Sequence, residues 1–207
     1  GMFCNNSDPS FVNVTVSRNV SAIADGGGLF ISTNSNVNLL NTIIANNNSN
    51  DIEFSSTGDT SMITLLYSNI DGGQDSIVIN DNGTITWGDG NIDVDPRFID
   101  SENSNYHLLA SSMLINAGHP DSTDSDGTRA DIGAYPYLTD NTEPVWYINT
   151  AGNDTIGTGT SVNPFASIQA GINFSSDADS VTVAAGTYVE NIDFRGRNIK
   201  VVGEDRE

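Results

Sequence analysis

The chain has 207 residues, of which 37% are apolar and 16% are charged, and 27 acidic residues against 7 basic ones give a net charge of −20. Such a chain lacks the basic footprint that displaces phosphate counterions, so nucleic acid is not an expected partner. The apolar runs are too short to span a bilayer, and no membrane insertion is expected. A single cysteine, Cys4, excludes an intrachain disulfide framework.

Short β-strands are predicted for the first part of the chain. Runs rich in apolar and β-branched residues recur there, each bounded by Asn, Gly, Ser or Asp, the residue types that close turns. The runs cover residues 11–16, 28–31, 37–40, 42–44 and 62–66.

These runs also repeat at long range. Residues 13–19 align with residues 41–47 at an offset of 28, and residues 41–44 align loosely with residues 67–70 at an offset of 26. A period of this size with several short strands per repeat is typical of a solenoid. Because a leucine ladder is missing, we expect a parallel β-helix whose corner asparagines stack from one coil to the next.

One helix is predicted, over residues 163–175. Asn163 suits the N-cap position, and Phe165, Ile168 and Ile172 then form one apolar stripe. Such a helix is expected to cover the open end of a solenoid, where unpaired strand edges invite aggregation. The strands predicted after it cover residues 180–184, 188–194 and 198–202.

Two sets of short motifs give information in addition to the repeat pattern. The first lies in residues 8–135 and comprises Gly26-Gly27-Gly28, Asp95-Pro96-Arg97-Phe98, Tyr106-His107-Leu108, Asn116-Ala117-Gly118 and Asp131-Ile132-Gly133-Ala134-Tyr135. The second lies in residues 146–203 and comprises Trp146-Tyr147-Ile148, Gly152-Asn153-Asp154, Gly157-Thr158, Asn163-Pro164-Phe165, Ile168-Gln169-Ala170, Gly186-Thr187-Tyr188 and Val201-Val202-Gly203. The first set resembles the C-terminal coils of secreted, pectin-lyase-like right-handed β-helix proteins, and the second resembles their N-terminal capping unit.

The resemblance implies an all-β fold, a right-handed single-stranded parallel β-helix (solenoid) with one short capping α-helix. Residues 1–137 would be the C-terminal coils and closing segment of one β-helix, residues 138–145 a linker, and residues 146–207 the capping unit and first rungs of another. Because a closing segment precedes an opening one, we expect a piece of a longer protein with tandem β-helices. The two uncapped rungs are expected to self-associate end to end, within one chain or between chains.

The basic residues do not form an expected catalytic site. Polysaccharide lyases of the resembling class use a Lys or Arg base, together with Ca²⁺ or a second base that neutralises the substrate carboxylate. No two bases here share an aspartate cluster on a middle rung, so no catalytic residue is assigned. We expect solvated surface positions or local salt bridges for Arg18, Arg97, Arg129, Arg195, Arg197, Lys200 and Arg206.

Two aspartate-rich runs are candidate Ca²⁺ sites, because hard cations bind several oxygen ligands. Neither run follows the EF-hand pattern. The alternative is that these carboxylates cap turns on an acidic surface. The candidate ligands are Asp121, Asp124, Asp126 and Asp131 in one run and Asp89, Asp93 and Asp95 in the other.

Trp87 is the predicted ligand-binding residue, with Asp89 beside it, since an exposed indole can stack on a sugar ring. Packing at a coil edge is the alternative for Trp87, while Trp146 is expected in the core. His107 and His119 are too few for a zinc-type ligand set.

The sequence therefore predicts a non-catalytic extracellular module, a scaffold or adhesin-like β-helix that binds a polysaccharide or surface glycan and calcium. Its source is expected to be a secreted or surface-displayed bacterial protein, although this sequence carries no signal peptide. One alternative is a fragment of a polysaccharide lyase or epimerase whose catalytic rungs lie elsewhere. The other is a purely structural spacer.

Overall fold

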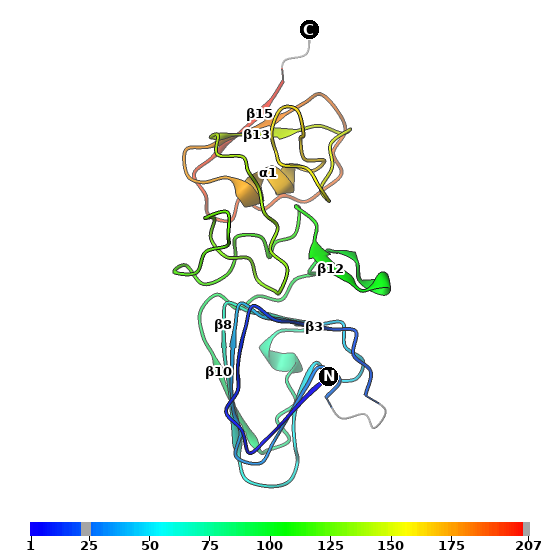
Figure 1. Cartoon of the computed structure of the whole chain (residues 1–207), viewed down its shortest axis with the longest axis vertical. Coiled ribbons are helices and arrows are strands. Elements are labelled where there is room, and N and C mark those ends of the chain that lie inside the picture. Colours follow the sequence, from blue (N-terminus) through cyan, green and yellow to red (C-terminus); the bar gives the residue numbers. More distant parts are fainter. Residues whose placement is uncertain (22–25, 205–207) are drawn as a thin grey trace.

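The computed structural model describes residues 1–21 and 26–204, and it consists mostly of short β-strands with one short α-helix (Figure 1). Stacked parallel coils form a β-solenoid of about three turns, which confirms the predicted fold class.

Each of the first three coils contributes one strand to each of three parallel sheets, and the following coil adds a fourth strand to one of them. Sheet A consists of β1 (Met2–Asn5), β4 (Leu29–Ser32) and β7 (Ile52–Phe54). Sheet B consists of β2 (Ser10–Val12), β5 (Asn36–Leu40), β8 (Ser61–Leu66) and β10 (Gly83–Trp87). Sheet C consists of β3 (Thr15–Ser17), β6 (Ile43–Ala45) and β9 (Asn69–Ile70).

The strand register confirms both predicted repeat offsets. Thr15 pairs with Ile43, and Ile43 pairs with Asn69. At the corner before sheet C, Asn13 and Asn41 adopt left-handed conformations with φ of 54° and 50°, and Asn41 Nδ2 donates a 3.1 Å hydrogen bond to Asn13 Oδ1. Asparagine tolerates this backbone region better than most residues, which explains its place at the corner.

Alternate residues of each strand point into the solenoid and form its core. Leu39 and Leu65 stack in sheet B, and Ile44 lies opposite them in sheet C, each no more than 1% exposed. Figure 1 looks down the solenoid axis and shows the turn η1 (Gln74–Ser76, teal) lying over the interior of the triangular coils. Ile77, directly after η1, belongs to the same buried cluster, so this turn covers the β10 end of the core.

Residues 93–137 cover the outer face of sheet C. They include the antiparallel hairpin of β11 (Phe98–Asp100), η2 (Ser101–Asn103) and β12 (Asn105–Leu108). The side chain of Asn69 bonds both the N–H and the carbonyl of Val94, and Gly133 N donates to Asn41 O at 2.8 Å. The outward side chains of Ile43 and Ala45 therefore join a second core cluster, which extends into the C-terminal part.

The C-terminal part is a smaller parallel sheet with a helix on one face. The sheet has β13 (Val145–Ile148), β14 (Ser180–Val183) and β15 (Lys200–Gly203), and α1 spans Ile168–Phe174. Gly171 of α1 lies against Val181 and Ile148, where an added Cβ would come within 2.8 Å of both side chains.

The helix is shorter than predicted, and Asn163 is not its N-cap. Phe165 N donates to Tyr147 O at 3.0 Å, and Phe165 O accepts from Asn149 N at 2.9 Å, so this residue is held in extended pairing. The helix can begin only after that, and Ser167 caps it by accepting from Ala170 N at 3.3 Å.

The predicted strand over residues 188–194 does not form. The Glu190 carboxylate accepts from the N–H groups of Ile168 and Gln169 at the start of α1. The Gln169 side chain in turn bonds both the N–H and the carbonyl of Asp193. The segment is therefore held against α1 by these side-chain bonds, and at Asp193 the helix side chain takes the place of a neighbouring strand.

Candidate functional site

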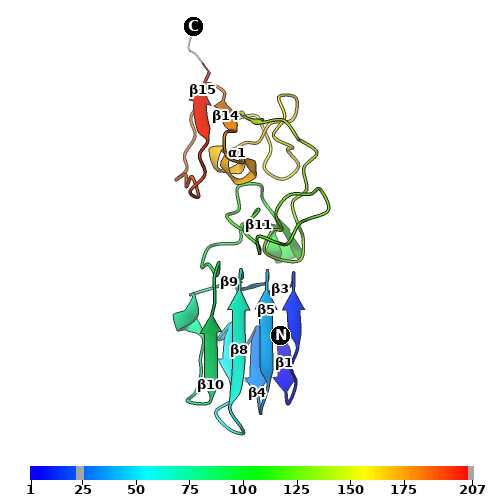
Figure 2. The same cartoon turned by 90° about the vertical axis from the view of Figure 1, so that its left-hand side faces the viewer.

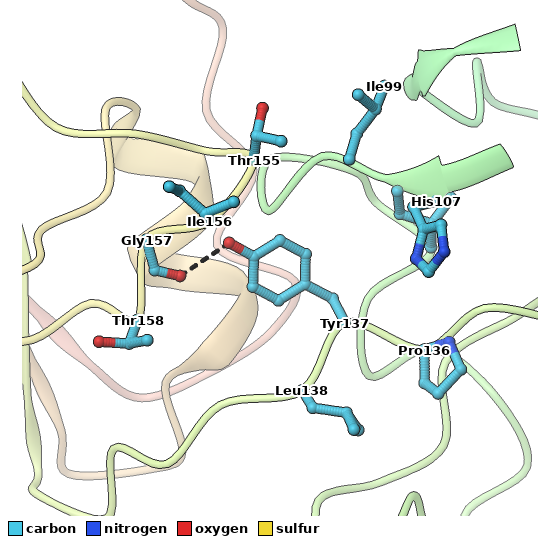
Figure 3. Close-up of a pocket in the computed structure, with 10 residues that line it drawn as sticks. Ile99, His107, Pro136, Tyr137, Leu138, Thr155, Ile156, Gly157 and Thr158 are labelled. Atoms are coloured by element: carbon cyan, nitrogen blue, oxygen red, sulfur yellow. Dashed lines mark hydrogen bonds between the residues drawn. The ribbon is translucent and has the colours of Figure 1, made fainter. Parts of the chain in front are cut away.

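A small hollow lies between the β11–β12 hairpin and the loop of residues 155–158 (Figure 3). Its volume is about 180 Å³. The lining contains no Asp, Glu, Lys or Arg, although the chain as a whole carries a net charge of −20. The lining residues are Ile99, His107, Leu108, Pro136, Tyr137, Leu138, Thr155, Ile156, Gly157 and Thr158.

Tyr137 joins the two sides of the hollow. Its hydroxyl donates a 2.7 Å hydrogen bond to Gly157 O, as Figure 3 shows, and its N–H donates to Asp131 Oδ2 at 2.7 Å. Burial, with the negative charge of Asp154, raises the pKa of Tyr137 further above its usual value. The phenol therefore stays neutral and keeps its donor at physiological pH.

Exposed rings and apolar side chains surround the hollow. The rings of His107 and Tyr135 lie with centroids 4.7 Å apart and planes tilted by 34°, and Tyr135 is 44% exposed. Leu138 is 47% exposed and Ile156 is 70% exposed. The rim thus offers apolar faces to a ligand, and Thr155 and Thr158 add hydroxyl groups to the lining.

Three of the predicted calcium ligands meet around one turn, where backbone N–H groups already bind them. Asp131 is 3% exposed and accepts from Asn116 N and Tyr137 N, each at 2.7 Å. Asp124 Oδ2 accepts from Asp131 N at 2.9 Å. Burial raises the pKa of Asp131 to about 7 and also raises the pKa of Asp124, which favours the uncharged acids.

Asp126 has the opposite electrostatic environment. Its carboxylate accepts hydrogen bonds from the N–H and hydroxyl of Thr128 and from Thr139 N. Burial opposes ionisation here, but these hydrogen bonds outweigh it and lower the pKa of Asp126. Asp121 lies in the preceding turn, where its N–H donates to His119 Nδ1.

The other aspartate run is also engaged in turns. Asp93 Oδ1 accepts from Gly72 N, and Asp95 Oδ1 accepts from Arg97 N. Within residues 1–21 and 26–204, no group of three or more His, Cys, Asp or Glu side chains is arranged to hold a metal ion. Calcium binding stays a prediction.

Trp87 lies at the end of β10 and is half-buried. The strand alternates, so that Ile85 and Trp87 pack on the solenoid core while Thr84 and Thr86 face solvent. Asp89 follows in an exposed turn. Trp146 is 5% exposed, and its Nε1 donates to Asp179 Oδ2, which confirms its predicted place in the core.

The sequence analysis did not select the residues of the hollow. The available signal was the triplet Tyr135-Pro136-Tyr137, in which two aromatic rings flank a rigid residue close to the predicted linker. Comparisons with protein-family models, with curated proteins and with solved structures find no match for this chain. Among its described helices, none is long and apolar enough to cross a membrane.

Proposed function

We propose that this chain is a non-catalytic β-solenoid scaffold that binds a neutral glycan at the hollow beside Tyr137. The observation that carries the proposal is the exposed pair of His107 and Tyr135 rings next to an uncharged lining. Sugar rings have apolar faces and polar edges, so they need both stacking surfaces and a few hydrogen-bonding groups. The carbonyls and threonine hydroxyls of the lining supply the hydrogen-bonding groups.

The outer face of sheet B would offer a polymer a second surface, separate from the hollow, because Figure 1 shows β8 and β10 on the opposite side of the coils from the β12 hairpin. A row of short polar side chains crosses its four strands, and Figure 2 looks onto these strands. The row consists of Ser10, Asn38, Thr64 and Thr86. Trp87 packs on the solenoid core, so it would contact a ligand only through the part of its ring that stays exposed at the end of β10, beside Asp89.

The kinship with secreted, pectin-lyase-like β-helix proteins belongs to the same proposal. It is supported by the parallel β-solenoid and by the motifs of the two stretches. A bacterial, extracellular or surface-displayed module with bound calcium at the Asp124–Asp131 turn is consistent with that kinship. Among the described residues of the coils, bases and carboxylates are not grouped in a way that would favour the alternative of a lyase or epimerase remnant. A purely structural spacer is the third candidate.

End-to-end self-association is also part of the proposal. In the described part of the chain, the strands of the first coil pair with the second coil alone, and β15 pairs with β14 alone. Their free edges carry unpaired backbone groups, which can accept a strand of another copy.

Affinity electrophoresis tests the glycan proposal. Gels containing soluble β-glucan, xylan or galactomannan would be compared with a gel containing polygalacturonate, each with calcium and with chelator. We expect at least one neutral polymer to retard the chain. Tyr135→Ala should weaken that retardation about fivefold, because a stacked aromatic contact contributes about 1 kcal/mol.

The matched control is Phe3→Ala, which removes another exposed ring, 65% exposed on sheet A, far from the hollow in sequence. This variant should migrate as the unmodified chain does. Equal retardation of Tyr135→Ala and Phe3→Ala, or no retardation by any neutral polymer, contradicts the proposal. Light scattering of the same samples measures self-association.

A further inference from the structure

A cluster of arginines lies on the side of α1 where the helix ends. Arg195 and Arg197 come from the segment between β14 and β15, and Arg129 comes from the segment that covers sheet C. Besides the effect of burial, the positive charges of neighbouring arginines lower the pKa of Arg195 and of Arg197. Three of the chain's seven basic residues are therefore concentrated at one place in a strongly acidic protein.

The hydrogen bonds of these guanidinium groups go to neutral acceptors. Arg195 Nη1 donates to Ile115 O and to Asn173 Oδ1, at 2.6 and 3.2 Å. Arg197 Nη1 donates to the carbonyls of Ile172, Asn173 and Ser175 at the C-terminal end of α1.

Arg129 follows the same pattern. Its Nε donates to Gly118 O at 2.7 Å and its Nη2 to Ala117 O at 3.4 Å, while its guanidinium carbon lies 5.7 Å from the centre of the Tyr67 ring. Within the described residues, no hydrogen bond joins any of the three guanidiniums to a carboxylate. Neutral partners satisfy donors but do not neutralise charge. The carboxylates of Asp131 and Asp193 act on Arg195, and those of Asp177 and Asp179 act on Arg197, without a hydrogen bond to either guanidinium in the described part of the chain.

Arg129 and Arg197 also line an open hollow of about 590 Å³. The bonds of Arg197 to described residues all leave from Nη1, and those of Arg129 leave from Nε and Nη2. The Nε–Nη2 edge of Arg197 and the Nη1 group of Arg129 are thus unused by these bonds. A guanidinium edge with two parallel N–H groups is the preferred partner of an oxyanion.

We propose that this hollow binds a tetrahedral oxyanion, a sulfate or phosphate group that is either free or a substituent on a glycan. The two guanidiniums reach it from different segments, so oxygens that point in different directions can each meet a donor. Ser175, Ser176 and Thr128 add polar groups to the wall. Asp177 at the same wall carries a negative charge that opposes the anion and lowers the expected affinity, whereas burial favours the uncharged form of nearby Asp131.

The net charge of the whole chain does not prevent such binding under ordinary conditions. Exposed charges are screened beyond about 8 Å at 0.15 M ionic strength. The charges at the wall, those of Arg129, Arg197 and Asp177, then have more effect inside the hollow than the net charge of the chain. The site is separate from the one proposed for a neutral glycan, since the two hollows share no lining residue.

Calorimetric titration tests the proposal, with sodium sulfate, sodium phosphate, dextran sulfate and unsulfated dextran as probes at a constant ionic strength of about 0.15 M. The unmodified chain should bind at least one of the three anionic probes and not dextran. Binding of the inorganic ions identifies a free oxyanion as sufficient, and binding of dextran sulfate alone identifies a substituent on a glycan. Arg129→Gln should weaken binding at least fivefold.

The control is Arg18→Gln, which removes the same charge at an exposed position on the first coil and should bind as the unmodified chain does. Arginine Nε–Hε resonances of the unmodified chain provide a measurement that needs no variant: those of Arg129 and Arg197 should shift on titration, while those of Arg18 and Arg97 stay. Absence of binding by every anionic probe, or equal weakening by both substitutions, overturns the proposal.

Discussion

In the coils of residues 2–92, asparagine side chains bond equivalent positions of neighbouring coils, whereas from residue 93 onward they bond unrelated segments. In the coils, asparagines bond their equivalents one turn away, as Asn41 bonds Asn13 and Asn19 bonds Asn47. In the later part, Asn173 joins segments about sixty residues apart by donating to Ala110 O and Ser112 O. Repetition stabilises the first region, whereas unique long-range bonds hold the second in place.

This difference also appears in the two cores. The core of the coils is a stack of inward residues from successive strands, closed within the solenoid. The second core combines the outward side chains of β6 with residues of α1, β13 and β14. Damage to the first core should therefore remain local to the coils, whereas damage at Asn173 should loosen the joint between the regions.

The largest effect is expected from Phe54→Ala in the coils. Phe54 is fully buried, and its ring fits against Gly83, where a Cβ would lie 2.6 Å from Cγ. The loss should be about 3–5 kcal/mol of unfolding free energy, because the ring leaves a cavity in a closed core. Urea unfolding followed by Trp87 fluorescence in a Trp146→Phe background measures it. A loss below about 1 kcal/mol would show that the coils repack.

Asn173→Ala should cost somewhat less, about 2–4 kcal/mol, since it leaves several buried polar groups without partners. Besides its two donated bonds, Asn173 Oδ1 accepts from Gln169 Nε2 and Arg195 Nη1. The measurement is urea unfolding followed by Trp146 fluorescence in a Trp87→Phe background. Asn38→Ala on the exposed face of sheet B is the control and should change stability by less than about 0.5 kcal/mol. Similar losses in both variants would refute the role of Asn173 as a joint.

A change in the pH dependence of stability, rather than in stability at one pH, is expected from Asp131→Asn. The pKa of Asp131 is raised to about 7 in the folded chain and lies near 4 when unfolded, so the folded state binds the proton more tightly. Its contribution to stability is complete below about pH 4 and declines by up to about 1.4 kcal/mol per pH unit until about pH 7. Urea unfolding between pH 4 and pH 8 should show this decline in the unmodified chain and a flatter profile in the variant.

Asp126→Asn is the matched comparison for that experiment. The pKa of Asp126 is lowered, so its ionised form stabilises the fold above about pH 4 and that stabilisation is lost at lower pH. The profile between pH 4 and pH 7 should therefore keep its slope in Asp126→Asn. An unchanged slope in Asp131→Asn would mean that Asp131 is ionised throughout this range.

Sequence reasoning predicted the coils well, because in a repeated fold the strand register appears in the sequence as a period. The offsets of 28 and 26 match the observed pairings at Thr15 and Ile43. It failed where a unique tertiary bond outweighed local preference. Asn163 has the chemistry of an N-cap, but Phe165 pairs with Tyr147 in an extended conformation, so the helix begins only at Ile168. Residues 188–194 have strand composition, but Glu190 and Asp193 bond α1 instead.

The candidate site was harder to predict than the fold. Asp124, Asp126 and Asp131 do meet, as their spacing suggested, but their hydrogen bonds to backbone N–H groups depend on turns that composition does not specify. The hollow beside Tyr137 needs Gly157 and His107 brought together from segments fifty residues apart. The arginine cluster likewise depends on a fold-back of residues 195–197 onto α1.

The sideways attachment of the C-terminal part has a mechanical consequence. In Figure 2, β14 and β15 lie beside the solenoid and not at its end. They follow one another in the same direction as β5, β8 and β10. Tension between two such stacks would pull across their joint and load the bonds of Asn173 and Arg195 before any coil is stretched. The coils would act as stiff blocks, and extension under force would begin at the joint between them.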